Sequence, residues 1–247
     1  MTSEIRLLTW NINQFSGVEQ GVPCDTDVEA GVLKVIDDFL DHDGPAIVAL
    51  QEVPSEGGYG YKPNPEFIDY LTKQMGCDDV YDTLDGGFRS FHKVVAACRN
   101  VGVESHTEIP GVKSRVEIPK AWRRNLQNRY VPFRVTLDGR KMSMLALHAS
   151  GADGLHDALD HLGSWNELDS ERVVVVGDFN ANGEGRKAIK RFVDAHPEGL
   201  TRVDPRYPER LHSPDTVMYR GVSVEDVAVN CECDCLDHFP LTCTVQL

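Results

Sequence analysis

Polar side chains that can bind metals or transfer protons border the apolar runs of this sequence at six separate places. Four runs end in such residues, and two others begin directly after them. Polar groups at one edge of a sheet converge on a pocket that the sheet holds rigidly. We therefore predict a site at a sheet edge, built from Asn11, Glu52, His148, Asp178, Asn180, Asp215, Asp237 and His238.

Each of these residues has an ordinary structural explanation when it is taken alone. Gly177-Asp178 after a strand is commonly a turn, and a single His148 is compatible with a half-buried histidine that meets its hydrogen bonds. Asp237-His238 is compatible with a loop that enters a strand. The recurrence of acid/base and metal-ligand types at six run ends favours a functional site.

The residue types indicate metal-assisted phosphoryl chemistry. Carboxylates and amide oxygens are hard ligands, which suit Mg²⁺ or Mn²⁺ better than Zn²⁺. The two histidines supply groups that exchange protons near neutral pH. Hydrolysis of a phosphoester needs a metal on the phosphate oxygens, an oriented water and help for the leaving oxygen.

Strand-like and helical patterns alternate along the chain and predict an α/β protein with two sheets enclosed by helices. Amphipathic helices are expected after a cap at Thr26 or Asp27, after Asn64-Pro65, and over about 153–168 and 185–195. The expected strands are Ile5–Asn11, Ala46–Glu52, Val94–Cys98, Arg129–Leu137, Lys141–His148, Arg172–Gly177, Asp215–Tyr219 and Leu241–Val245.

Composition is typical of one soluble globular domain. The 247 residues are 41% hydrophobic and 26% charged, and no linker separates a second unit, so we expect a single domain over 1–247. No apolar run reaches the roughly 20 residues of a membrane helix, and no leader precedes the first strand, which favours a cytoplasmic protein. We also expect a monomer. Seven cysteines, an odd number, indicate reduced thiols.

The ordered motifs resemble those of the endonuclease/exonuclease/phosphatase superfamily, which includes deoxyribonuclease I. The resemblance spans Asn11 to Pro240, and its most specific parts are Gly-Asp-Phe-Asn and the C-terminal Asp-His. The matching motifs are Trp10-Asn11-Ile12, Leu50-Gln51-Glu52, Leu147-His148, Gly177-Asp178-Phe179-Asn180, Asp215-Thr216-Val217 and Asp237-His238-Phe239-Pro240.

The resemblance implies a four-layer α/β sandwich, in which two packed, mainly antiparallel β-sheets are flanked by α-helices. It also implies a Mg²⁺- or Mn²⁺-dependent phosphoric ester hydrolase. The metal would be held mainly by Glu52, with Asn11 and Asp237 beside it. The implied catalytic roles are a water oriented or deprotonated by Asp178 and held by Asn180, a His238 fixed by Asp215 that contacts the phosphate or acts as base, and a His148 that protonates the leaving group.

A basic strip interrupts the otherwise acidic chain. From Lys113 to Arg134 seven basic residues face one glutamate, whereas the whole chain carries a net charge of −14. Arg129 stands where the family has a phosphate-binding arginine and is the best candidate for that role. The alternative is a solvated charged face. Acidity elsewhere disfavours extended, non-specific binding to long nucleic acid.

The substrate stays open at this level. Nucleic acid, phosphoinositide, phospholipid head group and nucleotide-like small molecules are all compatible phosphoesters. The alternative function is a non-catalytic or regulatory protein that binds a phosphate ligand on the same fold. The cysteines of 231–235 are expected to be buried sheet residues, and a zinc- or redox-control site is the alternative reading.

Overall fold

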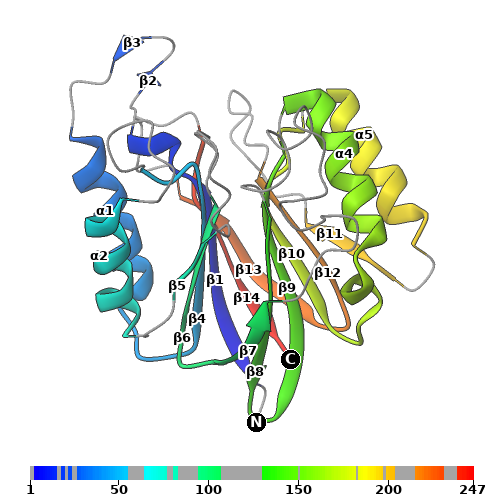
Figure 1. The fold of residues 1–247 in the computed structure, drawn as a ribbon, viewed down its shortest axis with the longest axis horizontal. Coiled ribbons are helices and arrows are strands. Elements are labelled where there is room, and N and C mark those ends of the chain that lie inside the picture. The colour runs from blue at the N-terminus through cyan, green and yellow to red at the C-terminus, as the bar shows by residue number, and fades with distance from the viewer. Residues whose placement is uncertain are drawn as a thin grey trace, which may run out of the picture.

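Two six-stranded β-sheets pack face to face, and helices cover both outer faces (Figure 1). The predicted four-layer sandwich is therefore confirmed. This computed structural model describes residues 3–15, 18–19, 22–23, 27–54, 64–76, 80–82, 94–106, 130–149, 151–181, 183–196, 199–203, 215–230 and 238–247.

The first sheet contains both chain ends of the described residues and most of the N-terminal strands. Its order is β13-β14-β1-β4-β6-β5. These strands are β13 (Ser223–Val229), β14 (Leu241–Gln246), β1 (Glu4–Asn11), β4 (Ala46–Gln51), β6 (Val94–Arg99) and β5 (Val80–Asp82).

The second sheet is built from the middle of the chain, in the order β11-β12-β10-β9-β8-β7. A separate short ribbon pairs β2 (Val18–Glu19) with β3 (Val22–Pro23). The strands of the second sheet are β11 (Thr201–Val203), β12 (Asp215–Arg220), β10 (Val173–Asp178), β9 (Arg140–His148), β8 (Tyr130–Leu137) and β7 (Gly102–His106).

Each sheet contains one parallel pair among antiparallel neighbours, as predicted for mainly antiparallel sheets. β1 lies parallel to β4 and β9 lies parallel to β10. The connection between each pair contains a helix, α1 (Val28–Leu40) in the first case and α4 (Gly151–Ser164) in the second. Because parallel strands end at the same edge, each unit delivers two strand ends to one rim.

The helices begin and end where the local sequence satisfies their free backbone groups. The Asp27 side chain accepts from the Ala30 amide at the start of α1. Asn64 accepts from two amides at the start of α2 (Pro65–Met75), which ends at a left-handed Gly76. Both caps confirm the predicted helix starts. A further helix, α5 (Gly183–Asp194), packs beside α4 on the second sheet.

Three apolar clusters hold the layers together. One lies between the two sheets, one beneath α1 and α2, and one beneath α4 and α5. The strands supply both sides by alternation: Leu8 and Trp10 of β1 face the helices, whereas Ile5 and Leu7 face the other sheet. Burial on both faces explains why these strands read as nearly continuous apolar runs.

The structure differs from the sequence reading mainly at sheet edges. β5, β7, β11 and β13 were not predicted, because they are short or interrupt the apolar alternation. β13 is irregular, because its register with β14 shifts between Glu225 and Ala228 and Asp226 has a positive φ. Its sequence therefore lacks the alternation of apolar and polar residues that predicts a strand. The helix predicted over 153–168 ends at Ser164, and a 3₁₀ turn follows at Asn166–Asp169.

Several sequence features lie outside the described residues. These are Asp237, Arg129, most of the basic strip from Lys113 to Arg134, and the cysteines of 231–235. Within the described ranges, no helix combines the length and the apolar character that crossing a membrane requires.

Candidate active site

The space between the sheets changes from apolar to polar at one end of the sandwich. Along β10, Val174 and Val176 belong to the inter-sheet core, and the next residue on that face is Asp178. Since alternate residues share a face, β1 places Asn11 in line with Ile5 and Leu7. The predicted site therefore closes the inter-sheet core at its rim.

The second sheet brings three predicted residues into one lateral row. Asp178 of β10 pairs with His148 of β9 on one side and with Asp215 of β12 on the other. Cross-strand partners on one face lie about 5 Å apart. Three segments distant in the sequence thus place a carboxylate, an imidazole and a second carboxylate side by side.

The first sheet supplies the facing groups. Asn11 of β1 pairs with Gln51 of β4, and Glu52 follows directly. Glu52 has a φ of +50°, in the left-handed region that side chains other than glycine rarely adopt. This local turn carries the Glu52 carboxylate toward His148, with its Oε1 3.4 Å from His148 Nε2. Strained backbone of this kind is concentrated at functional sites.

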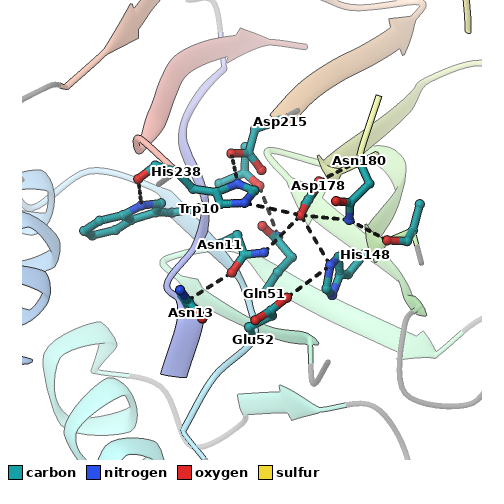
Figure 2. A network of polar contacts seen from close by, with 12 residues as sticks. Trp10, Asn11, Asn13, Gln51, Glu52, His148, Asp178, Asn180, Asp215 and His238 are labelled. Carbon is teal, nitrogen blue, oxygen red and sulfur yellow. Dashed lines mark hydrogen bonds and ion pairs between the residues drawn. The ribbon is translucent and has the colours of Figure 1, made fainter. Parts of the chain in front are cut away.

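Asp178 is the centre of the polar network (Figure 2). Its Oδ2 accepts from Asn11 Nδ2 at 3.0 Å and from Asn180 Nδ2 at 3.2 Å. Its Oδ1 accepts from the Asn180 backbone amide at 2.6 Å. His148 Nε2 lies 3.3 Å and His238 Nε2 3.9 Å from Oδ2. A fully buried carboxylate thus accepts three hydrogen bonds from Asn11 and Asn180, and ring nitrogens of His148 and His238 lie close to it.

The surroundings of Asp178 favour its ionised form. Burial by itself raises the pKa of this carboxyl, but the hydrogen bond with His148 and the charges of His238 and His148 lower it. The hydrogen bond from Asn11 acts in the same direction, and the resulting pKa is about 2. Asp178 is therefore a carboxylate at any pH near neutrality.

This pKa predicts how the stability of the metal-free protein varies with pH. Ionised Asp178 stabilises the folded chain above 3.8, the pKa of a free carboxyl, and this contribution is lost as the pH falls towards about 2. We expect the difference in free energy of unfolding between the wild type and Asp178→Asn to shrink over that window. Urea unfolding with EDTA at several pH values measures it, and a difference independent of pH would contradict the prediction.

His148 is enclosed between two carboxylates. Its ring is almost wholly buried, and Nε2 lies at nearly equal distances from Glu52 Oε1 and Asp178 Oδ2. The imidazole therefore connects the two sheets across the rim. It separates two negative charges that would otherwise repel each other.

His238 stands on the opposite side of Asp178. Its Nδ1 lies 3.5 Å from Asp215 Oδ2, while Nε2 points toward Asp178. Ligand atoms of Asp178, Asp215 and His238 all lie within 4.8 Å of one another, a spacing that can also hold a metal ion. The same spacing allows a carboxylate to orient an imidazole for proton transfer.

Asn180 shapes the loop that follows β10. It has a φ of +48°, and its Nδ2 donates to the Ala149 carbonyl at 2.6 Å as well as to Asp178. Asparagine tolerates this left-handed conformation better than most residues. Asn180 thus ties the ends of β9 and β10 together and presents its amide to the same carboxylate.

Seven of the nine predicted site residues are described, and the structure brings all seven to one rim. They are Asn11, Glu52, His148, Asp178, Asn180, Asp215 and His238. Two residues in the network were quoted in motifs without a role. Trp10 Nε1 donates to the His238 carbonyl, and Gln51 Nε2 donates to Thr9 Oγ1 and the Ala49 carbonyl. Both precede a predicted site residue, but the Trp10–His238 and Gln51–Thr9 contacts form only in the tertiary structure.

Comparison with protein-family models finds no match to this sequence, and comparison with curated proteins finds none either. Solved structures do match. TDP2 from D. rerio, complexed with single strand DNA product, superposes with a TM-score of 0.62 at 16% identity, over 99% of this chain and all of that one. The human Nocturnin catalytic domain with bound sulfate anion superposes with a TM-score of 0.64 at 18% identity, over 99% of this chain and 95% of that chain.

An endonuclease/exonuclease/phosphatase protein from Beutenbergia cavernae DSM 12333 gives a TM-score of 0.61 at 16% identity, over 99% of this chain and 72% of that chain. Together these likenesses establish the architecture. The chain shares the fold of these three structures, one of which is described as an endonuclease/exonuclease/phosphatase protein, and the fold that the motif resemblance implied is thereby confirmed.

Proposed function

We propose that the chain is a divalent-metal-dependent phosphoesterase. It hydrolyses a phosphodiester or phosphomonoester through attack of an activated water. The observation that carries this proposal is the buried, ionised Asp178 held between two imidazoles and two asparagine amides. Burying a charge destabilises the folded state, and apolar packing does not offset that cost. Buried ionised groups of this kind are therefore concentrated at catalytic sites.

The donor set fits Mg²⁺ or Mn²⁺. Glu52 contributes a carboxylate, and Asn11, which pairs with the residue before Glu52, contributes an amide oxygen. Carboxylate and amide oxygens are the ligands these hard cations take. We assign the metal to Glu52 and Asn11, with Asp237 as a third ligand. When bound, the cation would polarise the phosphate and neutralise developing charge.

The low pKa of Asp178 and the contact between Asp215 and His238 indicate which group orients the water and which accepts its proton. A carboxyl with a pKa of about 2 is a poor proton acceptor, so Asp178 orients the attacking water instead of deprotonating it. Asn180, bound to the same carboxylate, holds that water or a phosphate oxygen. The Asp215–His238 pair is the better base, because Asp215 orients the ring and leaves Nε2 toward Asp178.

We propose a role for His148 other than protonation of the leaving group, which is the role that the family resemblance implies. A group that protonates a leaving oxygen must turn a ring nitrogen toward the substrate, whereas His148 Nε2 lies 3.4 Å from Glu52 Oε1 and 3.3 Å from Asp178 Oδ2. We therefore assign His148 to holding the two carboxylates in place. Proton delivery to the leaving group then falls to water or to another residue of the rim.

The substrate is a compact or terminal phosphoester. The net charge of −14 disfavours wrapping a long polyanion, while Arg129 in the basic strip offers one point of phosphate contact. The D. rerio TDP2 structure contains a single strand DNA product, and the Nocturnin structure contains a sulfate anion. Single-stranded ends and small phosphate compounds are therefore the first substrates to test.

One panel tests the proposal. Single-stranded and plasmid DNA, abasic duplex, oligo-RNA, inositol phosphates, sphingomyelin and a chromogenic phosphodiester are each incubated with the protein and Mg²⁺ or Mn²⁺. We expect hydrolysis of at least one, abolished by EDTA and restored by added metal. Turnover that persists in EDTA would overturn the metal dependence.

Replacing Glu52 with glutamine is expected to weaken Mn²⁺ binding by about tenfold or more, because one formal charge leaves the donor set. Isothermal titration calorimetry measures this without any substrate. Glu184→Gln is the matched control, since Glu184 is an exposed residue on α5. Equal Mn²⁺ affinity in both variants would remove Glu52 from the metal site.

A non-catalytic phosphate-binding protein is the alternative function. It is disfavoured because Asp178 and the Asp215–His238 pair lie together as groups suited to orient a water and to accept its proton, which phosphate binding alone does not need. Mn²⁺ binding together with the absence of hydrolysis across the whole panel would support this alternative.

A further inference from the structure

Trp10 connects the first strand to the segment that carries His238. Its indole Nε1–H donates to the His238 backbone carbonyl at 3.0 Å, a contact between residues 228 positions apart (Figure 2). The Trp10 side chain is 0% exposed and belongs to the apolar cluster beneath α1 and α2. The donor is thus fixed by packing on all sides.

The carbonyl that Trp10 holds belongs to a residue whose ring is poised between two carboxylates. His238 Nδ1 lies 3.5 Å from Asp215, and Nε2 lies 3.9 Å from Asp178. These are long contacts, which a small backbone displacement would break. His238 precedes β14, so its main chain is not held by the strand ladder at this point.

We infer that Trp10 is a positioning residue for His238. Its indole N–H fixes the His238 main chain, and the fixed main chain sets the imidazole between Asp215 and Asp178. Trp10 touches no reacting atom. It acts by linking the rigid core beneath the helices to the one site histidine that lies outside a strand.

This inference rests on the proposed function only for its kinetic consequence. The effect on the position of the imidazole is independent of catalysis. The experiments therefore include one readout of turnover and two that need no substrate.

The test compares Trp10→Phe with Trp165→Phe. Phenylalanine preserves an apolar ring and removes only the indole donor and some volume. Trp165 is a matched control, because it is 1% exposed in the cluster beneath α4 and α5, and its Nε1 makes no hydrogen bond within the described residues. Both variants lose similar packing, but among the described residues only Trp10→Phe loses a hydrogen bond.

We expect Trp10→Phe to lower kcat by about tenfold with KM changed less than about twofold, and Trp165→Phe to change neither. The reason is that a displaced imidazole impairs the reaction step and leaves phosphate contacts in place. Equal kcat values at similar unfolding temperatures in the two variants would overturn the inference.

Nuclear magnetic resonance tests the same point without substrate. In wild-type protein, scalar coupling across the hydrogen bond should join Trp10 Nε1 to the His238 carbonyl carbon, and its absence would overturn the inference even if Trp10→Phe fails to fold. The His238 ring resonances should shift in Trp10→Phe and stay in place in Trp165→Phe. If no panel substrate is hydrolysed, the proposed function fails, but these two readouts still decide the role of Trp10.

Discussion

Replacing Asp178 with asparagine is expected to lower kcat/KM by about 10³-fold or more while the chain still folds. The substitution keeps the shape and one oxygen of the side chain, but it removes the charge that faces His148 and His238. A neutral amide cannot keep both imidazoles and a water in the same orientation. Steady-state kinetics on whichever panel substrate is hydrolysed measures the effect.

Asp169→Asn provides the matched control. The Asp169 carboxylate is 82% exposed and lies 3.7 Å from Arg220, away from the described network. We expect wild-type kinetics from this variant. Retention of more than about a tenth of wild-type kcat/KM by Asp178→Asn would show that the buried carboxylate is structural, and the mechanism proposed above would have to be abandoned.

Replacing Gly177 with alanine is expected to destabilise the protein by about 3 kcal/mol or more. Gly177 has a φ of +137°, and a Cβ at this position would lie 1.9 Å from the Leu147 carbonyl oxygen. β9 and β10 pair at this point, so the backbone of neither strand can move aside without breaking the ladder. Chemical unfolding measures the loss.

Gly139→Ala separates the two causes of that loss, which are the positive φ of the backbone and the clash of the added Cβ. Gly139 also has a positive φ, of +75°, in the turn between β8 and β9, but an added Cβ would meet nothing within 4 Å. We expect a cost of about 1 kcal/mol there from backbone conformation alone. Equal losses in the two variants would mean that the close approach of Leu147 is relieved by a small shift.

Gly177 also explains why the Gly-Asp pair carries information in the sequence. The close approach of β9 that excludes a side chain at Gly177 brings His148 into register with Asp178. The Gly-Asp pair, which resembles an ordinary turn in the sequence, is thus required for the alignment of His148, Asp178 and Asp215 on neighbouring strands. The same glycine serves the fold and the site.

The helix starts and the strand ends were predictable because their causes are local. Asp27 and Asn64 cap helices through side-chain contacts that span two or three residues. Apolar runs predicted the central strands because those strands are buried on both faces. Short edge strands such as β11 lack that burial, and the sequence reading did not find them.

The chemical groups of the site were also predictable, from the residue types that border the apolar runs of the sequence. Asn11, Glu52, His148, Asp178 and His238 each follow or precede an apolar run, and strand ends on the same rim bring such residues together. Their individual roles were not accessible in this way. Whether a histidine delivers protons or holds carboxylates depends on its burial and on which groups face its ring nitrogens.

The order of residues along the sequence therefore determined which chemical groups this protein possesses and at which strand ends they lie. Tertiary packing decided what surrounds each group. It buried His148 between Glu52 and Asp178, lowered the pKa of Asp178, and joined Trp10 to His238 across almost the whole chain. The physical reason is that strand and helix signals arise within a few residues, whereas hydrogen-bond partners and charge environments arise from segments that meet only after folding.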